Sequence, residues 1–185
     1  AEMVNEAVLD MMRDFTAKRD DVYHIHATGA IEKEAAAEGF RARGLEGCEN
    51  IRMSEYIYNM PELMAAADLV ICRAGAITVS ELAMSGKCVV FIPSPNVTNN
   101  HQYKNADVLR DAGAAELIEE SGLDARPLAG VAAELLSPDG DDRRETMSRN
   151  IRKFAVKDAG ELIYKDMKRL IEKKPDGNVK KFGRG

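Results

Sequence analysis

The chain has 185 residues, of which 45% are hydrophobic and 31% charged, and 26 Lys and Arg against 31 Asp and Glu give a formal net charge of −5. This length suits one domain, and these proportions are typical of a globular protein, so they argue against wholesale disorder and against a fibrous repeat. The acidic balance argues against a dedicated nucleic-acid-binding protein, which usually carries a basic surplus. No run of about 18 apolar residues occurs, so the sequence predicts no membrane span.

Cysteine and histidine patterns indicate neither disulfides nor a metal site. The three cysteines are odd in number, lie far apart and form no CxxC motif, which favours a reducing cytosol. His24, His26 and His101 show no ligand spacing relative to those cysteines, so we predict no bound metal. We also predict that the imidazoles of His24 and His26 point to opposite faces of a strand and therefore cannot hold one metal together.

Hydrophobic periodicity and turn residues predict helices and strands that alternate along the chain. In chain order we expect a helix over 2–19, a strand over 22–27, a helix over 31–43, a strand over 50–56, a helix over 61–67, a strand over 68–72, a helix over 76–85, a strand over 88–92, a helix over 101–112, a strand over 114–118, and helices over 124–136, 141–154 and 158–173. We take residues 1–174 as the domain and residues 175–185, rich in Gly and Lys, as a flexible tail.

This order of elements indicates an α/β fold, a doubly wound parallel sheet with helices on both faces. The continuous apolar runs at 68–72 and 88–92 are typical of strands buried on both faces. A doubly wound half normally begins with a strand, whereas this chain begins with a predicted helix. We therefore expect the first strand, and the loop after it, to lie upstream of residue 1.

The loop after the strand 68–72 is the first candidate ligand site. Arg73 is followed by the small residues Ala74-Gly75-Ala76 and then by a helix start, so backbone N–H groups and the helix dipole can face an anion such as a diphosphate. Thr78 adds a hydroxyl in the first turn, and Glu81, one turn on, can accept hydrogen bonds from both ribose hydroxyls.

These residues also have structural interpretations. Thr78 and Glu81 fit the T-x-x-E pattern of a capping box, and Glu81 would also complement the helix dipole. Gly75 would then serve only a tight turn. The loop matches neither the Walker pattern nor GxGxxG.

Two further places follow strand ends. In the polar loop after 88–92, Gln102 and Asn105 can each donate and accept hydrogen bonds to a polyhydroxylated ligand, although Asn99 or Asn100 would also cap the next helix. Tyr56 ends the strand 50–56 and would stack on a ring or, alternatively, lie in the core.

Two other motifs are interpreted as structural. The D-x-D in Asp139-Gly140-Asp141-Asp142 lies between two helices and not after a strand, which is typical of a solvated helix cap. The basic residues of the helix 141–154 are interpreted as solvated surface.

The run 67–83, which contains R-x-G-A-x-T-x-x-E, with Gly86-Lys87 and His101-Gln102-x-x-Asn105-Ala106, closely resembles the MurG family of peptidoglycan glycosyltransferases. This resemblance covers about residues 1–172. It implies the GT-B fold, two Rossmann-like domains that face each other across a cleft, of which this chain matches the C-terminal, nucleotide-sugar-binding half. It also implies that the acceptor domain, with its catalytic base, and a G-G-S-x-G loop lie upstream of Ala1.

The resemblance assigns a UDP-GlcNAc contact to each matching position, and no catalytic residue in this chain. It places Tyr56 near the uracil and the Ile57 backbone at the uracil edge. It implies that Ala76, Ile77 and Thr78 contact the diphosphate and that Glu81 binds the ribose, with Arg73 and Gly75 also among the donor-binding residues. Gln102, with His101 beside it, would face the GlcNAc hydroxyls, and Asn105 would support that loop.

The resemblance further implies inverting transfer of GlcNAc from UDP-GlcNAc to lipid I, giving lipid II, by an enzyme on the cytoplasmic face of the membrane, with no tightly bound cofactor. Two alternatives stay open: a nucleotide-sugar-binding subunit that needs a partner chain, and an enzyme similar to UDP-GlcNAc 2-epimerases. A dinucleotide-dependent oxidoreductase is disfavoured because no GxGxxG follows a strand.

Overall fold

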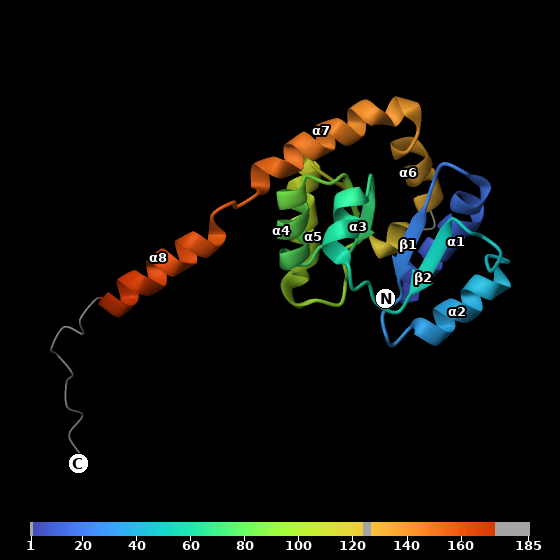
Figure 1. Cartoon of the computed structure of the whole chain (residues 1–185), viewed down its shortest axis with the longest axis horizontal. Coiled ribbons are helices and arrows are strands. Elements are labelled where there is room, and N and C mark those ends of the chain that lie inside the picture. Colours follow the sequence, from blue (N-terminus) through green and yellow to red (C-terminus); the bar gives the residue numbers. More distant parts are fainter. Residues whose placement is uncertain (1, 124–126, 173–185) are drawn as a thin grey trace, which may run out of the picture. The chain divides into compact units, whose positions relative to one another are not determined.

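The computed structural model describes residues 2–123 and 127–172 and divides the chain into a unit of residues 1–155 and a second unit of residues 156–185. Helices and strands alternate along the first unit (Figure 1). Its helices are α1 (Glu2–Asp14), α2 (Lys33–Ala42), α3 (Met60–Ala66), α4 (Ala76–Ser85), α5 (His101–Asp111), α6 (Leu128–Leu135) and α7 (Asp141–Ile151), and its strands are β1 (His24–Ala27), β2 (Ile51–Ser54), β3 (Val70–Cys72), β4 (Val89–Phe91) and β5 (Glu116–Leu117). The second unit contributes α8 (Ala159–Glu172). The predicted tail, 175–185, lies outside the described residues.

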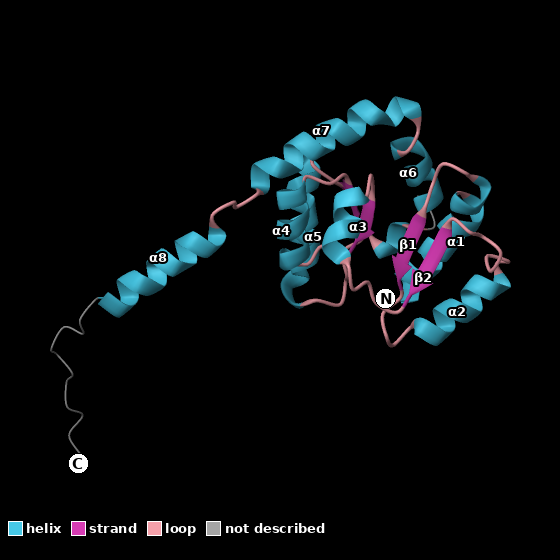
Figure 2. Cartoon of the chain, viewed as in Figure 1, coloured by secondary structure: helices cyan, strands magenta, loops and turns pink. Residues whose placement is uncertain are grey.

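The strands are all parallel, as predicted, but they form two sheets (Figure 2). One sheet has the order β1-β2 and the other the order β3-β4-β5. A doubly wound sheet commonly has the strand order 3-2-1-4-5-6. In that order strands 3 and 2 are neighbours, and so are strands 4, 5 and 6. The sets β2-β1 and β3-β4-β5 correspond to these two groups if β1 to β5 are numbered 2 to 6. The pairing is therefore compatible with the strand order of a doubly wound sheet.

Strand β4 is the most buried strand, and its side chains alternate between two hydrophobic cores. Val90 packs in a core with α1 and α6, whereas Val89 and Phe91 pack in a second core with α4 and α5. All three side chains are fully buried. Because alternate residues of a strand point to opposite faces, helices cover both faces of this sheet, which confirms the doubly wound α/β fold.

The prediction for His24 and His26 was wrong. Their rings lie 6.4 Å apart between centroids in a T-shaped arrangement, because residues two apart on a strand share a face. The Nε2 of His26 donates to the side-chain oxygen of the buried Asn5 over 3.0 Å, and the Thr16 hydroxyl lies 3.3 Å from His24 Nδ1. The pair is thus tied to α1 and to the turn that follows it.

This histidine pair should make stability depend on pH. Burial lowers the pKa of His24 and of His26, each to about 4 from the usual 6.5. Between those pH values the unfolded chain binds more protons than the folded one, so stability falls as the pH is lowered through that window. We expect the free energy of unfolding in urea to drop by on the order of 2–4 kcal/mol between pH 7 and pH 5.

The variant His24→Gln/His26→Gln should lose most of this pH dependence, while His101→Gln, which alters an exposed ring, should keep it. An undiminished fall in stability in the double variant would assign the effect to other groups.

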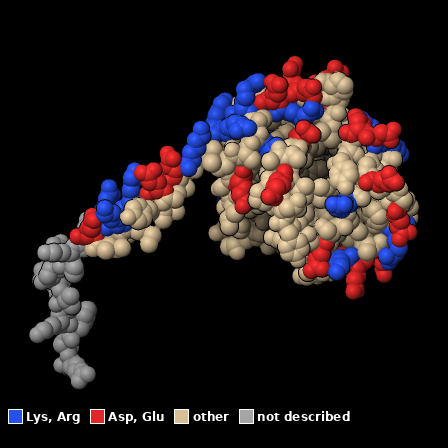
Figure 3. All heavy atoms as spheres, in the orientation of Figure 1, with Lys and Arg blue, Asp and Glu red and all other residues tan. Residues whose placement is uncertain are grey.

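Charges on α7 are balanced, and both signs line this helix (Figure 3). Arg143 pairs with Glu116 and Glu134, and Arg144 pairs with Asp141. Asp141, part of the D-x-D, begins the helix. Arg143 and Arg144 are therefore engaged in ion pairs within the protein, which supports the interpretation as surface.

Helix α8, described by itself, is amphipathic. Its apolar side chains are all exposed: Leu162, Ile163, Tyr164, Met167, Leu170 and Ile171. Within the described residues, no helix has both the length and the apolar character needed to cross a membrane.

Candidate functional site

The β3–α4 loop leaves a helix N-terminus open at the carboxyl edge of the sheet. Gly75 is the N-cap of α4 with φ −65° and ψ 147°, and no side chain caps the helix. The first intrahelical bond of this turn runs from Val79 N–H to Gly75 O, so the N–H groups of Ala76, Ile77 and Thr78 have no partner inside the helix. Ile77 is 76% exposed. This turn can therefore donate several backbone hydrogen bonds to an anion.

Two structural alternatives for this loop, the capping box and the tight turn at Gly75, are not supported. Thr78 is the third residue of α4 and not its cap, so the capping-box interpretation of Thr78 and Glu81 was wrong. Gly75 has an ordinary φ, and a Cβ added there would meet only the Thr78 hydroxyl oxygen, at 3.8 Å. The glycine is thus required neither by the turn nor by packing, and it leaves clearance above the helix end.

Glu81 lies one turn further along α4, on its exposed surface. Among the described residues its carboxylate has no hydrogen-bond or ion-pair partner. A free carboxylate at this position can accept two hydroxyl hydrogen bonds from a ligand whose phosphates lie at the helix N-terminus.

The β4–α5 loop is held by Gln102. Its side-chain oxygen accepts a 2.9 Å hydrogen bond from Ser94 N–H, which leaves the amide NH₂ to donate. Asn99 and Asn100 both have positive φ, 54° and 53°, a conformation that asparagine tolerates better than most residues. Asn100 is the N-cap of α5 by position, but its side chain makes no capping hydrogen bond.

The two loops are joined by Asn105. Its Nδ2 donates to Ala74 O over 3.1 Å, so α5 is tied to the residue that precedes Gly75. Helices α4 and α5 lie side by side (Figure 1), and their strands β3 and β4 are paired from Val70 with Val89 to Cys72 with Phe91. His101, the first residue of α5, is exposed, and its Nδ1 donates to Thr98 O over 2.9 Å. The structure thus brings both predicted loops to one edge.

Tyr56 follows β2, which belongs to the other sheet. It is 63% exposed and contacts Tyr58 edge to face with ring centroids 5.0 Å apart, so the core alternative was wrong. Among the described residues, the backbone N–H and C=O of Ile57 have no hydrogen-bond partner, and both remain available to a base edge.

Arg73 is directed inward and not toward open solvent. Its Nη1 donates to Ile92 O over 3.1 Å, and its Nη2 forms a close ion pair with Glu120. Glu120 lies in the turn after β5, so one guanidinium contacts the segments that follow all three strands of the sheet. We did not predict Glu120 from the sequence, although its place after a strand carboxyl end was a usable signal.

A hollow of about 370 Å³ opens beside this ion pair. Its lining contains no basic residue and consists of Met3, Pro93, Pro95, Asn100, Tyr103, Glu119, Glu120 and Ser121. In the described part of the chain, no group of three His, Cys, Asp or Glu side chains is arranged to hold a metal ion. This edge therefore presents an uncapped helix N-terminus next to neutral and acidic hydrogen-bonding groups.

Comparison with protein families and curated proteins gives consistent matches. Residues 1–163 match the glycosyltransferase family 28 C-terminal domain. A Bacillus cytotoxicus protein named as the UDP-N-acetylglucosamine–N-acetylmuramyl-(pentapeptide) pyrophosphoryl-undecaprenol N-acetylglucosamine transferase is 35% identical over 173 residues, 94% of this chain and 46% of that protein. A Thermoanaerobacter sp. (strain X514) protein of the same name is 36% identical over 92% of this chain and 45% of its own length. The chain thus spans about half the length of these curated relatives.

Solved structures show the same similarity. MurG of Acinetobacter baumannii superposes with a TM-score of 0.74 at 26% identity, covering 91% of this chain and 46% of that one. A Listeria monocytogenes protein described as a putative UDP-N-acetylglucosamine 2-epimerase gives a TM-score of 0.63 at 18% identity, covering 93% of this chain and 41% of that one. The second likeness is one of fold alone.

Proposed function

We propose that this chain is the donor-binding half of an enzyme that transfers GlcNAc from UDP-GlcNAc to lipid I. The chain belongs to the glycosyltransferase family 28 C-terminal domains, which residues 1–163 match. The names of the relatives support both substrates. The acceptor, lipid I, and attachment to the cytoplasmic face of the membrane belong to the same proposal, as properties of the whole enzyme.

The arrangement on α4 is the observation that carries this proposal. An uncapped helix N-terminus at Ala76–Thr78 and an unpartnered carboxylate at Glu81 lie one turn apart on one helix. A nucleoside diphosphate presents its phosphates and its ribose hydroxyls next to each other. The first turn would bind the phosphates and Glu81 the ribose, while Tyr56 and Ile57 would contact the uracil.

The same helix end would contribute to the reaction itself. When the acceptor hydroxyl attacks the anomeric carbon of GlcNAc, the bond to UDP breaks and negative charge develops on the leaving diphosphate. Backbone N–H groups fixed in advance stabilise such charge without reorganisation. Arg73, whose guanidinium is held by Ile92 O and by the Glu120 carboxylate, lies two residues before the N-cap of this helix.

Calorimetric titration of the chain with UDP-GlcNAc, UDP, a GDP-sugar and NAD tests the proposal. We expect binding of the two uridine ligands and none of the other two. The alternative of an enzyme similar to UDP-GlcNAc 2-epimerases rests on fold alone, at 18% identity, and so has less support than the transferase. Binding of NAD in preference to UDP would refute the donor-site assignment.

Gln102 should discriminate the sugar from the nucleotide. Gln102→Glu keeps the oxygen that accepts from Ser94 N–H and removes the NH₂ donor, so it should weaken UDP-GlcNAc binding by roughly tenfold, the equivalent of about one hydrogen bond, and leave UDP binding nearly unchanged. Gln102→Ala removes both groups and should also loosen the loop. Equal losses for UDP and UDP-GlcNAc in Gln102→Glu would show that this side chain does not contact the sugar.

A further inference from the structure

Arg73 and Glu120 join three loops that are distant in the sequence. Arg73 directly follows β3, Ile92 directly follows β4, and Glu120 lies in the 3-10 turn Glu120–Gly122 after β5. The guanidinium contacts the other two residues at once, through Nη1 to Ile92 O and through Nη2 to the Glu120 carboxylate. Since β3, β4 and β5 are neighbours in one parallel sheet, this single side chain spans the carboxyl edge of the sheet.

The ion pair is sheltered from solvent. The side chain of Arg73 is 28% exposed and that of Glu120 is 13% exposed. Such a pair is harder to break than a surface pair, because removal of one partner leaves the other charge poorly hydrated. Ala74, the next residue, is fully buried, and its carbonyl accepts the hydrogen bond from Asn105. Two successive residues of the loop are therefore fixed immediately before Gly75, the N-cap of α4.

We infer that Arg73 and Glu120 are positioning residues for the donor site: their ion pair holds the β3–α4 loop so that the N–H groups of Ala76–Thr78 point at the diphosphate. This inference rests on the proposed function. It gives Glu120 a role in binding although it does not touch the nucleotide, and it revises the prediction that Arg73 binds the donor directly. A guanidinium with two partners in the protein acts on the ligand through the helix that it aligns.

A double-mutant cycle distinguishes positioning from direct contact. Arg73→Gln and Glu120→Gln should each weaken UDP binding on the order of tenfold, the affinity equivalent of one hydrogen bond to a charged group. The double variant should lose no more than either single variant, because the two residues act as one unit. Affinity for uridine, which has no phosphate, should be the same in all four proteins. Weak affinities can be measured by saturation-transfer NMR.

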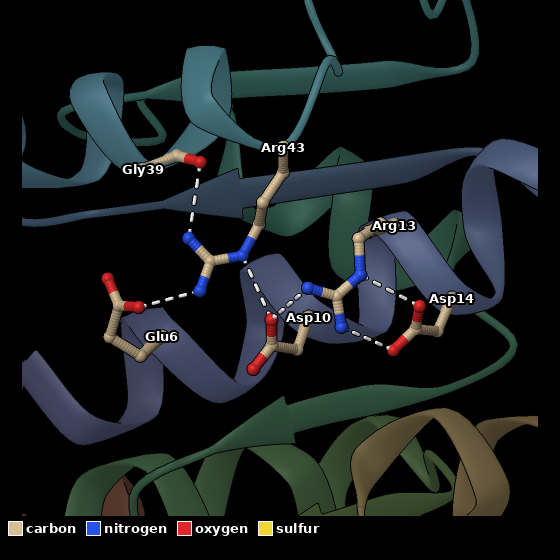
Figure 4. Close-up of polar contacts among 6 residues, drawn as sticks. All are labelled: Glu6, Asp10, Arg13, Asp14, Gly39 and Arg43. Atoms are coloured by element: carbon tan, nitrogen blue, oxygen red, sulfur yellow. Dashed lines mark hydrogen bonds and ion pairs between the residues drawn. The ribbon is translucent and has the colours of Figure 1, made fainter.

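A second arginine-centred ion-pair network, whose carboxylates are more exposed than that of Glu120, is the control. Arg43 pairs with Glu6 and Asp10 and donates to Gly39 O over 3.2 Å, linking α1 to α2 (Figure 4). Arg43→Gln and Glu6→Gln make the same charge changes and should leave UDP affinity unchanged. Where Arg73→Gln does not fold, Arg73→Lys takes its place in the cycle, because it keeps the charge opposite Glu120 and loses the forked geometry.

Three results would contradict the inference. Wild-type affinity for UDP in Glu120→Gln, with a loss in Arg73→Gln, would show that Arg73 contacts the ligand directly and would overturn the inference. Equal losses of affinity for uridine and for UDP would show that the ion pair only stabilises the fold, and would also overturn the inference. If the wild-type chain itself binds no UDP, the proposed function fails first, and the inference fails with it.

Discussion

The 185-residue chain alone should form no detectable lipid II when it is incubated with labelled UDP-GlcNAc and a lipid I analogue. Its curated relatives are about twice as long: the chain spans 46% of the Bacillus cytotoxicus protein and 45% of the Thermoanaerobacter protein. General-base catalysis requires a group within about 3 Å of the acceptor hydroxyl. The resemblance to MurG places that base, and the acceptor pocket, in the half of the enzyme that this chain does not match.

We do not expect the histidines of this chain to replace that base. His24 and His26 lie on β1 and contact Thr16 and Asn5, away from α4 and α5. His101 is exposed beside the donor loop, and its Nδ1 donates to Thr98 O. Donor binding by this chain should be detectable but weak. The resemblance assigns part of the diphosphate contact to a G-G-S-x-G loop that this 185-residue sequence does not contain, and each charged hydrogen bond lost with that loop costs about 1.5–3 kcal/mol of binding free energy.

Addition of the N-terminal half of a relative should restore transfer, and the assay is the appearance of labelled lipid II. The matched control is the same mixture with Glu81→Ala in this chain, which should stay inactive at low donor concentration. Lipid II made by the wild-type chain alone would show that the catalytic machinery has been misplaced.

Element order and strand direction could be predicted because they follow from local patterns. Helix α4 begins and ends where it was predicted, at 76 and 85, since Gly75 precedes it and Gly86, in the left-handed region with φ 66°, ends it. The first helix is shorter than predicted and ends at Asp14, where a 3-10 turn over Thr16–Lys18 follows. Apolar periodicity continues through such a turn, so it gives no boundary.

Contacts between distant residues could not be predicted in the same way. Arg73 and Glu120 are joined only because β3 and β5 flank β4, and no periodicity or motif relates two residues so far apart. The division of the strands into two sheets likewise depends on pairing between distant segments, which local propensity does not reveal. The ligand assignments for Tyr56, Thr78 and Gln102 stay predictions, although the structure places the last two at one edge.

The capping box failed for a physical reason that sharpens the interpretation of Glu81. The T-x-x-E pattern predicts a cap only if its threonine precedes the helix, whereas α4 already begins at Ala76. With no capping role, the carboxylate of Glu81 contributes little to folding. Its presence on an exposed turn next to an open helix end is then better explained by a ligand.

Glu81→Ala should weaken UDP binding by roughly 10–100-fold while the fold stays intact. A carboxylate that accepts two ribose hydroxyls makes charge-assisted hydrogen bonds of about 1.5–3 kcal/mol each, which are not fully additive. Loss of the side chain should cost less stability than the ~1 kcal/mol of a true cap, because none of the described residues uses it. Glu81→Gln should lie between alanine and wild type.

The decisive measurement compares UDP with 2′,3′-dideoxy-UDP in calorimetric titrations. The wild-type chain should prefer UDP, and Glu81→Ala should bind both ligands with the same reduced affinity, because the preference resides in the two hydroxyls that the carboxylate accepts. Glu38→Ala, which removes an exposed glutamate from α2, is the matched control and should retain the wild-type preference. A folded Glu81→Ala protein that still prefers UDP by the wild-type factor would remove Glu81 from the ribose site and leave the helix N-terminus as the main determinant of donor binding.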